Sequence, residues 1–426
     1  MAAETTLGED DLVRADDGLR ATDALLRDSY PGDDGTRQPV HTVYVPADRF
    51  DPGMPARWGA EAAEAVAVAG GTARLAETVG LGELAEELSP LVDAKLAAEP
   101  IEDLRLDFED GYGARGDEQE DADAVRAADR VLAALSEGVA PPFVGIRFKC
   151  FEAPTRRRGI RTLDLFVTRL AQGGGLPDGL VLTLPKVTTV DQVDAMVVLV
   201  ERLEERLGLA PGRLRFEVQM ETPQLVVAAD GTVPVARLLH RSPGRVSALH
   251  YGTYDYSASL QIAAAHQSME HPAADFAKQV MQVAVAETGV RLSDGSTNVI
   301  PVGDPAHVRD AWRLHARLVR RSLERGYYQG WDLAATQLPT RFLATYAFYR
   351  EGFRSAARRL DNYLHGSDAT IMDEPATARA LARFVVRGLE CGAVTEAEVR
   401  DAAAATPSEL VALAHPKLAT SEKEHS

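Results

Sequence analysis

The 426-residue sequence contains only two cysteines, Cys150 and Cys391, which lie far apart. This excludes a framework of disulfide bonds and a thiolate metal cluster, and it is consistent with a reducing cytoplasm. The sequence has no run of about 18 apolar residues, so we expect no membrane-spanning helix. Its first eleven residues are acidic and have no apolar core, so we expect no signal peptide. Together these absences predict a cytoplasmic protein.

Basic residues are also too few to balance the acidic ones. The chain has 46 Lys and Arg against 64 Asp and Glu, a formal net charge of −18. A chain this acidic is repelled by nucleic acid and by anionic membranes, so we exclude both as partners. The apolar content of 45% with 26% charged residues is ordinary for a globular protein. The length suits one large domain with an appendage, or two domains.

Segments with strand character alternate with segments of helical periodicity. The predicted strands are 41–46, 104–109, 144–148, 180–184, 214–221 and 246–251, with weaker ones at 290–292 and 330–333. Helices are predicted between them at 121–135, 190–207, 274–287 and 306–324. Strands separated by helices pair in parallel through right-handed crossovers. About eight such units predict an α/β protein with a (β/α)₈ TIM barrel over residues 39–339.

The remaining residues form extensions on both sides of the predicted barrel. Residues 1–38 form an acidic N-terminal extension with one helix at 10–29. Residues 340–418 form a C-terminal helical extension, with predicted helices at 340–364, 374–389, 395–404 and 407–414. Residues 419–426 are polar, and we expect them to be disordered. Barrels of this kind usually associate, so we expect a homo-oligomer.

Two predicted strands alternate charged and apolar residues in a way that bears on the barrel interior. In 104–109 and in 214–221 the even positions are apolar and the odd positions are polar or charged. Both faces of a parallel barrel sheet are covered, so the apolar set suits the helices and the charged set would line the lumen. The predicted lumen residues are Arg105, Asp107, Glu109, Arg147, Arg215, Glu217, Gln219 and Glu221. Buried charges must be mutually paired, and we expect Arg105 or Arg215 to pair with Glu217.

The sharpest candidate pair is Glu221, which closes the fifth strand, and Asp255, just past the sixth. Active sites of such barrels lie where the strands end, and carboxylates on neighbouring strands could share a divalent cation. Oxygen ligands without a nearby His or Cys suit Mg²⁺ or Mn²⁺. Alternatively, Glu221 forms a salt bridge with Arg147 or Lys186, and Asp255 caps a helix over 256–265. The spacing leaves both interpretations open.

Charged residues also end the second and third strands. Arg147 could hold a substrate carboxylate or stabilise a developing enolate oxygen, or it could simply neutralise Glu109 and Glu221. Asp107, Glu109 and Asp110 form an acidic cluster. Crowded carboxylates raise one another's pKa, so one of them is a candidate general acid or base. The alternative is that they order metal-bound waters.

The loop after the third strand is rich in arginine, with Arg156, Arg157, Arg158 and Arg161. Such a basic loop could bind phosphates or carboxylates, or it could be solvated or paired locally. Three histidines are expected to pack or to cap helices and not to bind metal, namely His250, His266 and His271.

The strand ends carry six motifs in a characteristic order. They are Tyr44-Val45-Pro46-Ala47, Leu106-Asp107-Phe108-Glu109-Asp110, Ile146-Arg147-Phe148, Leu184-Pro185-Lys186-Val187, Met220-Glu221-Thr222 and Tyr251-Gly252-Thr253-Tyr254-Asp255. In this order the chain resembles the HpcH/HpaI aldolase and citrate lyase β-subunit superfamily of phosphoenolpyruvate/pyruvate-type barrels. Four positions depart from that pattern, and the first two are Tyr256, where the motif has Leu, and Gln261, where the family usually has Gly. Leu333-Ala334 stands where the family often has Ile-His, and Asp110 stands where the aldolase branch has a histidine.

The resemblance implies a Mg²⁺-dependent carbon–carbon lyase. In that reading Glu221 and Asp255 carry the metal, and Arg147 binds the oxygen that becomes the enolate of a pyruvate-like 2-oxoacid. Lys186, Gly252 and Thr253 would bind substrate together with Arg147. An alternative keeps the barrel and the metal but uses a CoA thioester, as a lyase, synthase or thioesterase. A further alternative is a barrel that binds a metabolite without catalysis.

Overall fold

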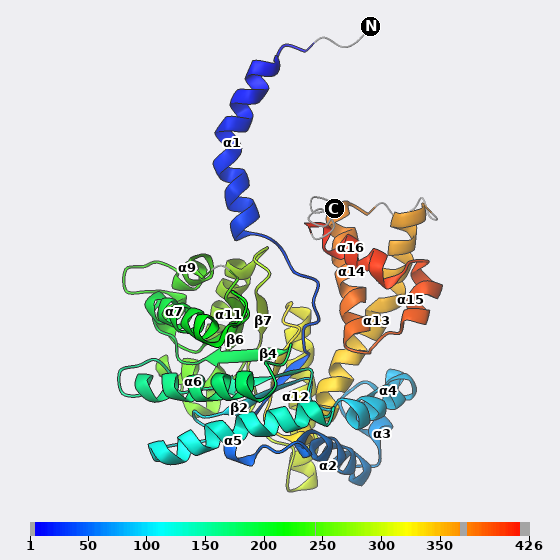
Figure 1. Cartoon of the computed structure of the whole chain (residues 1–426). Coiled ribbons are helices and arrows are strands. Elements are labelled where there is room, and N and C mark those ends of the chain that lie inside the picture. The colour runs from blue at the N-terminus through cyan, green and yellow to red at the C-terminus, as the bar shows by residue number, and fades with distance from the viewer. Residues whose placement is uncertain (1–4, 243, 367–372, 418–426) are drawn as a thin grey trace.

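Eight parallel strands form a barrel in the computed structural model, which describes residues 5–242, 244–366 and 373–417 (Figure 1). The strands are β1 (His41–Pro46), β2 (Asp103–Asp107), β3 (Phe143–Arg147), β4 (Leu180–Leu184), β5 (Phe216–Met220), β6 (Val246–Tyr251), β7 (Arg291–Ser293) and β8 (Gly330–Asp332). Neighbours along the chain pair in parallel from β1 to β7, and β1 pairs with β8. A parallel bridge between Ser293 and Gln329 completes the circle. The prediction of a TIM barrel is confirmed.

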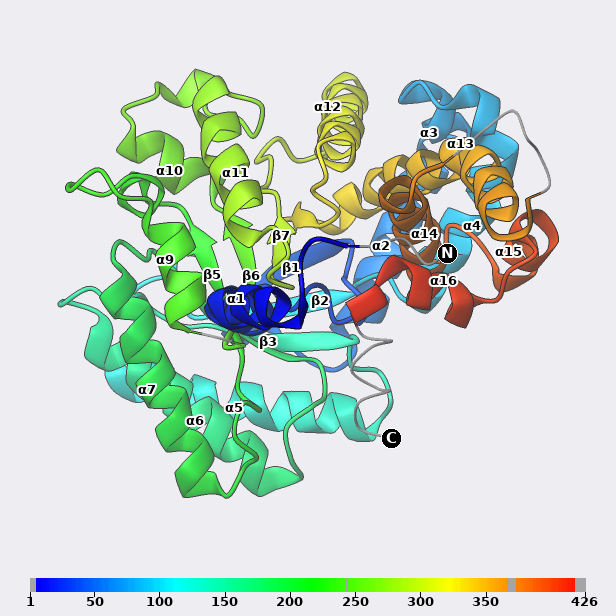
Figure 2. The same cartoon turned by 90° about the horizontal axis from the view of Figure 1, so that it is seen from above.

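Helices surround the strands, as Figure 2 shows from above. Those that follow the strands are α5 (Asp117–Ser136), α6 (Arg156–Gly173), α7 (Val190–Leu207), α9 (Pro234–Arg241), α11 (Pro272–Val285), α12 (Pro305–Glu324) and α13 (Leu338–His365). Three helices lie between β1 and β2, namely α2 (Met54–Val68), α3 (Thr72–Thr78) and α4 (Ala85–Ala98). Two short helices, α8 (Pro223–Val226) and α10 (Thr253–Ser259), follow β5 and β6 directly. Short 3₁₀ helices lie at Ala47–Arg49, Gly82–Leu84, Ala264–His266 and Ala335–Gln337.

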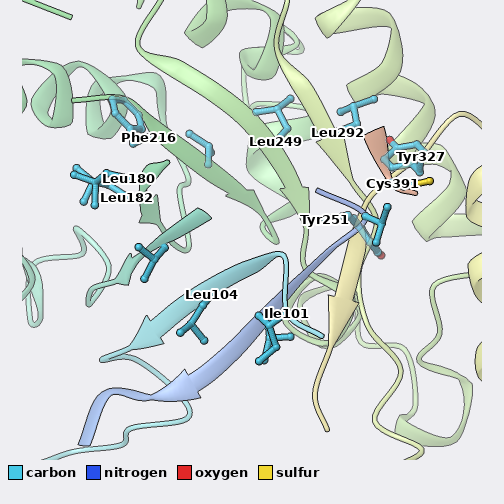
Figure 3. Packing of buried hydrophobic residues seen from close by; sticks show 14 of the residues in the cluster. Ile101, Leu104, Leu180, Leu182, Phe216, Leu249, Tyr251, Leu292, Tyr327 and Cys391 are labelled. Carbon is cyan, nitrogen blue, oxygen red and sulfur yellow. The ribbon is translucent and has the colours of Figure 1, made fainter. Parts of the chain in front are cut away.

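The apolar residues of the strands pack outward against these helices. Leu104, Leu182, Phe216 and Leu249 have no exposed surface and belong to one core cluster (Figure 3). Burial of apolar surface on this side is the main favourable contribution to folding. Because side chains alternate along a strand, the residues between them must point into the barrel. The alternation of apolar and charged residues along the strands therefore determines which charged side chains enter the lumen.

The two extensions differ in how much they contact the barrel. Helix α1 (Glu9–Ser29) buries none of its residues and projects away from the body (Figure 1). On the other side, α14 (Pro375–Glu390), α15 (Glu396–Ala403) and α16 (Pro407–Ala414) continue from α13. Helix α13 packs on both α12 and α4 and also on α14, so it joins the barrel to these helices.

The predicted division into domains stays a prediction, and its limit at residue 339 falls inside the first turn of α13. The predicted tail at 419–426 lies outside the described residues. Among the residues that are described, no helix combines the length and the apolar character needed to cross a membrane.

A buried ionic network anchors α12 and α13 to the barrel. Asp332, at the end of β8, has no exposed surface and accepts hydrogen bonds from three side chains. The donors are His41 Nδ1 at 2.8 Å, His315 Nε2 at 3.0 Å and Arg341 through Nη2 at 2.9 Å. Burial raises the pKa of Asp332, but the charge of Arg341 and the histidine hydrogen bonds outweigh it and hold the pKa well below its ordinary value. The carboxylate is therefore charged at neutral pH and links three elements.

We expect Asp332→Asn to lower the free energy of unfolding by about 3–5 kcal/mol, because it leaves the Arg341 guanidinium buried without its counter-charge. Chemical denaturation at pH 7 measures the change. Glu205→Gln, which breaks an exposed pair with Arg202, is the matched control and should change stability by less than about 1 kcal/mol. Equal effects of the two substitutions would contradict the anchoring role of Asp332.

Candidate active site

The lower part of the barrel lumen is filled by a closed group of paired charges. Arg105, which is 1% exposed, donates to Glu217 from Nη2 at 2.8 Å and to Asp103 from Nη2 at 3.0 Å. Thr183 donates to Glu217 at 2.5 Å. Burial raises the pKa of Glu217, but the charges of Arg105 and its hydrogen bonds outweigh it and lower the pKa to about 2. This layer confirms the expected pairing of Arg105 with Glu217.

Above it, Arg147 is held in one orientation by its neighbours. Its Nε and Nη2 donate to the two oxygens of Asp107 at 2.7 and 2.8 Å, a bidentate pair. Its guanidinium carbon lies 4.7 Å from the ring centre of Tyr44. The third nitrogen, Nη1, has only long contacts, 3.5 Å to Gln219 and 3.6 Å to Glu109. Arg147 therefore presents one loosely engaged nitrogen toward the strand ends.

Both carboxylate oxygens of Asp107 accept hydrogen bonds that hold Arg147 and the loop after β2 in place. Besides Arg147, it accepts from the backbone N–H of Glu109 at 3.0 Å and of Gly111 at 2.8 Å. A side chain at Gly111 would clash with it, since an added Cβ would lie 2.6 Å from Asp107 Oδ2. These four bonds fix the loop after β2 as well as the guanidinium.

The remaining predicted site residues gather around Lys186 at the rim. Its Nζ lies 2.9 Å from Glu109, 2.7 Å from Asp110 and 3.6 Å from Asp255. Its backbone N–H donates to Glu221 Oε1 at 2.7 Å. Lys186 has a φ of 49°, a left-handed conformation that costs energy for a side chain other than glycine. This turn aims the backbone N–H at Glu221 while the ammonium reaches the other three carboxylates.

Glu221 and Asp255 converge on this rim from neighbouring strands. The Glu221 side chain is 2% exposed and lies against Gly252, where an added Cβ would come within 2.6 Å of Oε2. Asp255 is 46% exposed and belongs to the first turn of α10. Gly252 and Thr253 connect β6 to α10 directly beside Glu221. The predicted juxtaposition of the two strand ends is therefore present.

The rim carboxylates repel one another. Burial raises the pKa of Glu221 to about 8, opposed by Arg147 and reinforced by the charges of Asp255 and Glu109. Burial likewise raises the pKa of Glu109, and its Oε2 is buried without a hydrogen-bond partner. Lys186 and Arg147 thus do not fully neutralise this cluster of acids. A group whose pKa is shifted this far by burial and neighbouring charge is typical of functional sites.

These residues fit a hard divalent cation. Within the described ranges, no three His, Cys, Asp or Glu side chains come together as a metal-binding group. Mg²⁺ often takes only one or two carboxylates from a protein and completes its shell with water and substrate. Glu221 and Asp255 would supply those two. Glu109 Oε2 is buried without a hydrogen-bond partner, and burial together with the charges of Asp255 and Glu109 raises the pKa of Glu221, so a cation bound here would be stabilised by these acids.

Two of the sequence-based interpretations are corrected by the geometry. Arg215 does not enter the lumen beside Glu217, because β5 begins one residue later and the side chain turns to the opposite, N-terminal end, where it is 42% exposed. Asp255 does not cap a helix over 256–265, since α10 spans Thr253–Ser259 and Gly252 precedes it. Arg147 does form the considered ion pair with Glu109, at 3.6 Å, but its closest partner is Asp107.

The expected basic loop is in fact the first turns of α6. Arg158 and Arg161 pair there with Asp121 of α5, both at 2.5 Å, and Arg156 donates to the backbone oxygen of Phe151. Gly159 allows this helix to approach the chain, because an added Cβ would lie 2.1 Å from the Lys149 oxygen. Of the two interpretations of this arginine run, the structure therefore shows local pairing.

Two of the three histidines have the packing and capping roles that the sequence predicted. His250 is fully buried and accepts from the Trp331 indole at 3.2 Å, and His271 caps α11 by accepting from the N–H of Ala273. Sequence reasoning missed Tyr44, whose ring supports Arg147 and whose hydroxyl accepts from Gln219 at 3.2 Å. Tyr44 alternates with the apolar residues Val43 and Val45, and this pattern could have predicted that its side chain points into the lumen.

Comparisons with known proteins give one family and several similar folds. Residues 19–418 match the family described as "Domain of unknown function (DUF6986)", so the chain belongs to that family. No curated protein matches the sequence.

Among solved structures, a Haloferax volcanii malate synthase is 15% identical, with a TM-score of 0.49 over 72% of this chain and 74% of its own. The citrate lyase β subunit of M. tuberculosis, in complex with oxaloacetate and magnesium, is 15% identical, with a TM-score of 0.43 over 75% and 99% of the two chains. An HpcH/HpaI aldolase/citrate lyase family protein of Burkholderia cenocepacia is 17% identical, with a TM-score of 0.40 over 78% and 98%. At such identities and TM-scores the matches assign neither substrate nor activity.

We expect binding of Mg²⁺ to strengthen as the pH rises from 6 to 8, because the ion must displace the proton that Glu221 holds up to a pKa of about 8. One competing proton predicts a gain in affinity of about tenfold per pH unit, measured by calorimetry. Glu221→Gln should bind Mg²⁺ far more weakly and without this slope, whereas Asp110→Asn should retain the slope.

Stability without metal should show the opposite trend. Folded Glu221 keeps its proton up to about pH 8, whereas the unfolded chain releases it near the ordinary value of 4.5. The folded state therefore binds more protons between these values, and its stability falls as the pH rises through them. Comparing the denaturation of Glu221→Gln with that of the parent across this range checks the sign. A parallel pH dependence in both proteins would contradict a raised pKa at Glu221.

Proposed function

We propose that the chain is a Mg²⁺-dependent carbon–carbon lyase of the aldolase type, acting on a pyruvate-like 2-oxoacid. The observation that carries this proposal is the convergence of the carboxyl groups of Glu221 and Asp255 on Lys186, with the oriented guanidinium of Arg147 at the same end of the barrel. Glu221 and Asp255 would hold Mg²⁺, or Mn²⁺, which when bound polarises the carbonyl group of a 2-oxoacid and stabilises negative charge on its oxygen.

Arg147 is suited to hold the oxygen that becomes the enolate. Asp107 engages Nε and Nη2 and so fixes the plane of the guanidinium, while Nη1 remains available for a substrate oxygen. Because Asp107 and the Tyr44 ring hold the group before substrate binds, no energy is spent on orienting it during the reaction. Lys186, with the backbone at Gly252 and Thr253, would contact the substrate from the rim.

Glu109 is the best placed of the three acidic candidates to move a proton. Asp107 is committed to four hydrogen bonds, and Asp110 is 59% exposed, although both Asp110 and Glu109 pair with Lys186. Glu109 is buried, its pKa is raised by burial, and one of its oxygens has no hydrogen-bond partner. In the cleavage direction it would take the proton of the substrate hydroxyl as the C–C bond breaks, and return it to the methylene carbon of the enolate. Asp107 is then a positioning residue.

The arginine run at 156–161 could have bound the phosphates of CoA, but two of its four side chains are paired with α5. Arg158 and Arg161 share Asp121, and Arg158 also lies 3.4 Å from Glu120. The 2-oxoacid is therefore the substrate class we prefer.

The test is deuterium exchange into the methyl group of pyruvate, followed by proton NMR with and without Mg²⁺. We expect exchange that requires the metal, and a loss of about 10²–10³-fold in Arg147→Lys, which cannot keep the bidentate pair and the free nitrogen together. Glu109→Gln should lose about 10²-fold or more, and Asp110→Asn only a few-fold. Absence of exchange together with undetectable Mg²⁺ binding would favour the non-catalytic barrel.

A further inference from the structure

A cavity lined by charged and polar side chains lies at the opposite, N-terminal end of the barrel. Its volume is about 460 Å³, within the range of small-molecule sites. Its walls come from the segment before β1, with Asp34 and Thr36, and from the strand starts, with Arg215 and Arg291. The same lumen layer that includes Arg105 forms its floor. None of the residues assigned to the proposed reaction lines this cavity.

The guanidinium of Arg215 is poorly neutralised here. Its Nε is buried without a hydrogen-bond partner, and among the described residues its ion pair is with Asp34, at a long 3.8 Å. Burial lowers the pKa of Arg215, and Arg291 nearby adds to the lowering, against the opposing charge of Asp34. A partly buried guanidinium without a close counter-charge is stabilised when an anion binds to it.

Arg291 differs because the backbone already holds it. It donates to the oxygen of Arg37 at 2.7 Å and to that of Thr36 at 2.5 Å, which fixes its guanidinium at the cavity wall. Asp34 lies 3.4 Å from Arg291 as well as 3.8 Å from Arg215. One half-exposed carboxylate thus stands between two guanidiniums, at the place that an incoming acid group would take.

The floor limits which end of a ligand can point inward. Arg105 is shared there by two carboxylates, Asp103 and Glu217, so the floor carries excess negative charge. Neutral groups, including Ser247 and Gln329, line the cavity beside it. An acid group is therefore favoured near Arg215 and an uncharged polar part near the floor.

We propose that this cavity binds a small organic anion whose carboxylate or phosphate group pairs with Arg215 and Arg291 in the place of Asp34. The site is separate from the proposed catalytic rim, and it does not depend on the lyase assignment. Occupation of the site would release Asp34 from both guanidiniums.

The test uses two probes at constant ionic strength, inorganic phosphate followed by ³¹P line broadening and acetate followed by saturation-transfer NMR. Arg215→Gln should weaken binding about tenfold for whichever acid group the cavity accepts, since one charged contact is lost. Asp34→Asn should strengthen it several-fold, because the competing carboxylate is removed. Preference for one probe tells phosphate from carboxylate ligands.

Arg309→Gln is the control, since it removes the same charge from an exposed position on α12 and should leave binding unchanged. The proposal is overturned if Arg215→Gln and Arg309→Gln behave alike, or if Asp34→Asn binds no better than the parent. Arg215→Gln is expected to weaken binding and Asp34→Asn to strengthen it. Because the two effects are opposite, one variant still tests the proposal if the other folds poorly.

Discussion

The guanidinium of Arg105 lies in the centre of the barrel between two carboxylates, and the remaining charges of the lumen are arranged around this unit. An ion removed from water costs several kcal/mol unless partners replace its hydration. Asp103, Glu217 and the hydroxyl of Thr183 supply that replacement. The lower lumen is thereby closed to ligands, and binding is confined to the two open ends of the barrel.

The two ends differ in which charged group lacks a close partner. At the C-terminal rim, carboxylates outnumber cations, and burial together with the charges of Asp255 and Glu109 raises the pKa of Glu221 to about 8. At the N-terminal end, the buried Nε of Arg215 has no hydrogen-bond partner, and Asp34 lies 3.8 Å from its guanidinium. The acids of the rim suit a cation and Arg215 suits an anion, so the two proposed sites are chemically opposite.

Much of this arrangement follows from the period of two in the sequence. Leu104 and Phe216 are apolar and pack outward, so Arg105 and Glu217 had to enter the lumen and meet. The same reasoning failed for Arg215, because alternation gives the face of a side chain but not the point where the strand begins. For the arginine run at 156–161 the sequence left open whether it binds a ligand or is paired locally, because the acid that pairs with it lies on α5, about 40 residues away in sequence.

The sequence by itself determined the parallel barrel, the helices of both extensions and the set of residues at the strand ends, since periodicity and strand–helix alternation are local properties. Only the tertiary structure decided which partner each charge takes. It assigned Asp107 to orient Arg147, placed Lys186 among Glu109, Asp110 and Asp255, and left Arg215 short of counter-charge. Ion pairs depend on distances of a few ångströms between segments remote in the chain, and no local pattern encodes those distances.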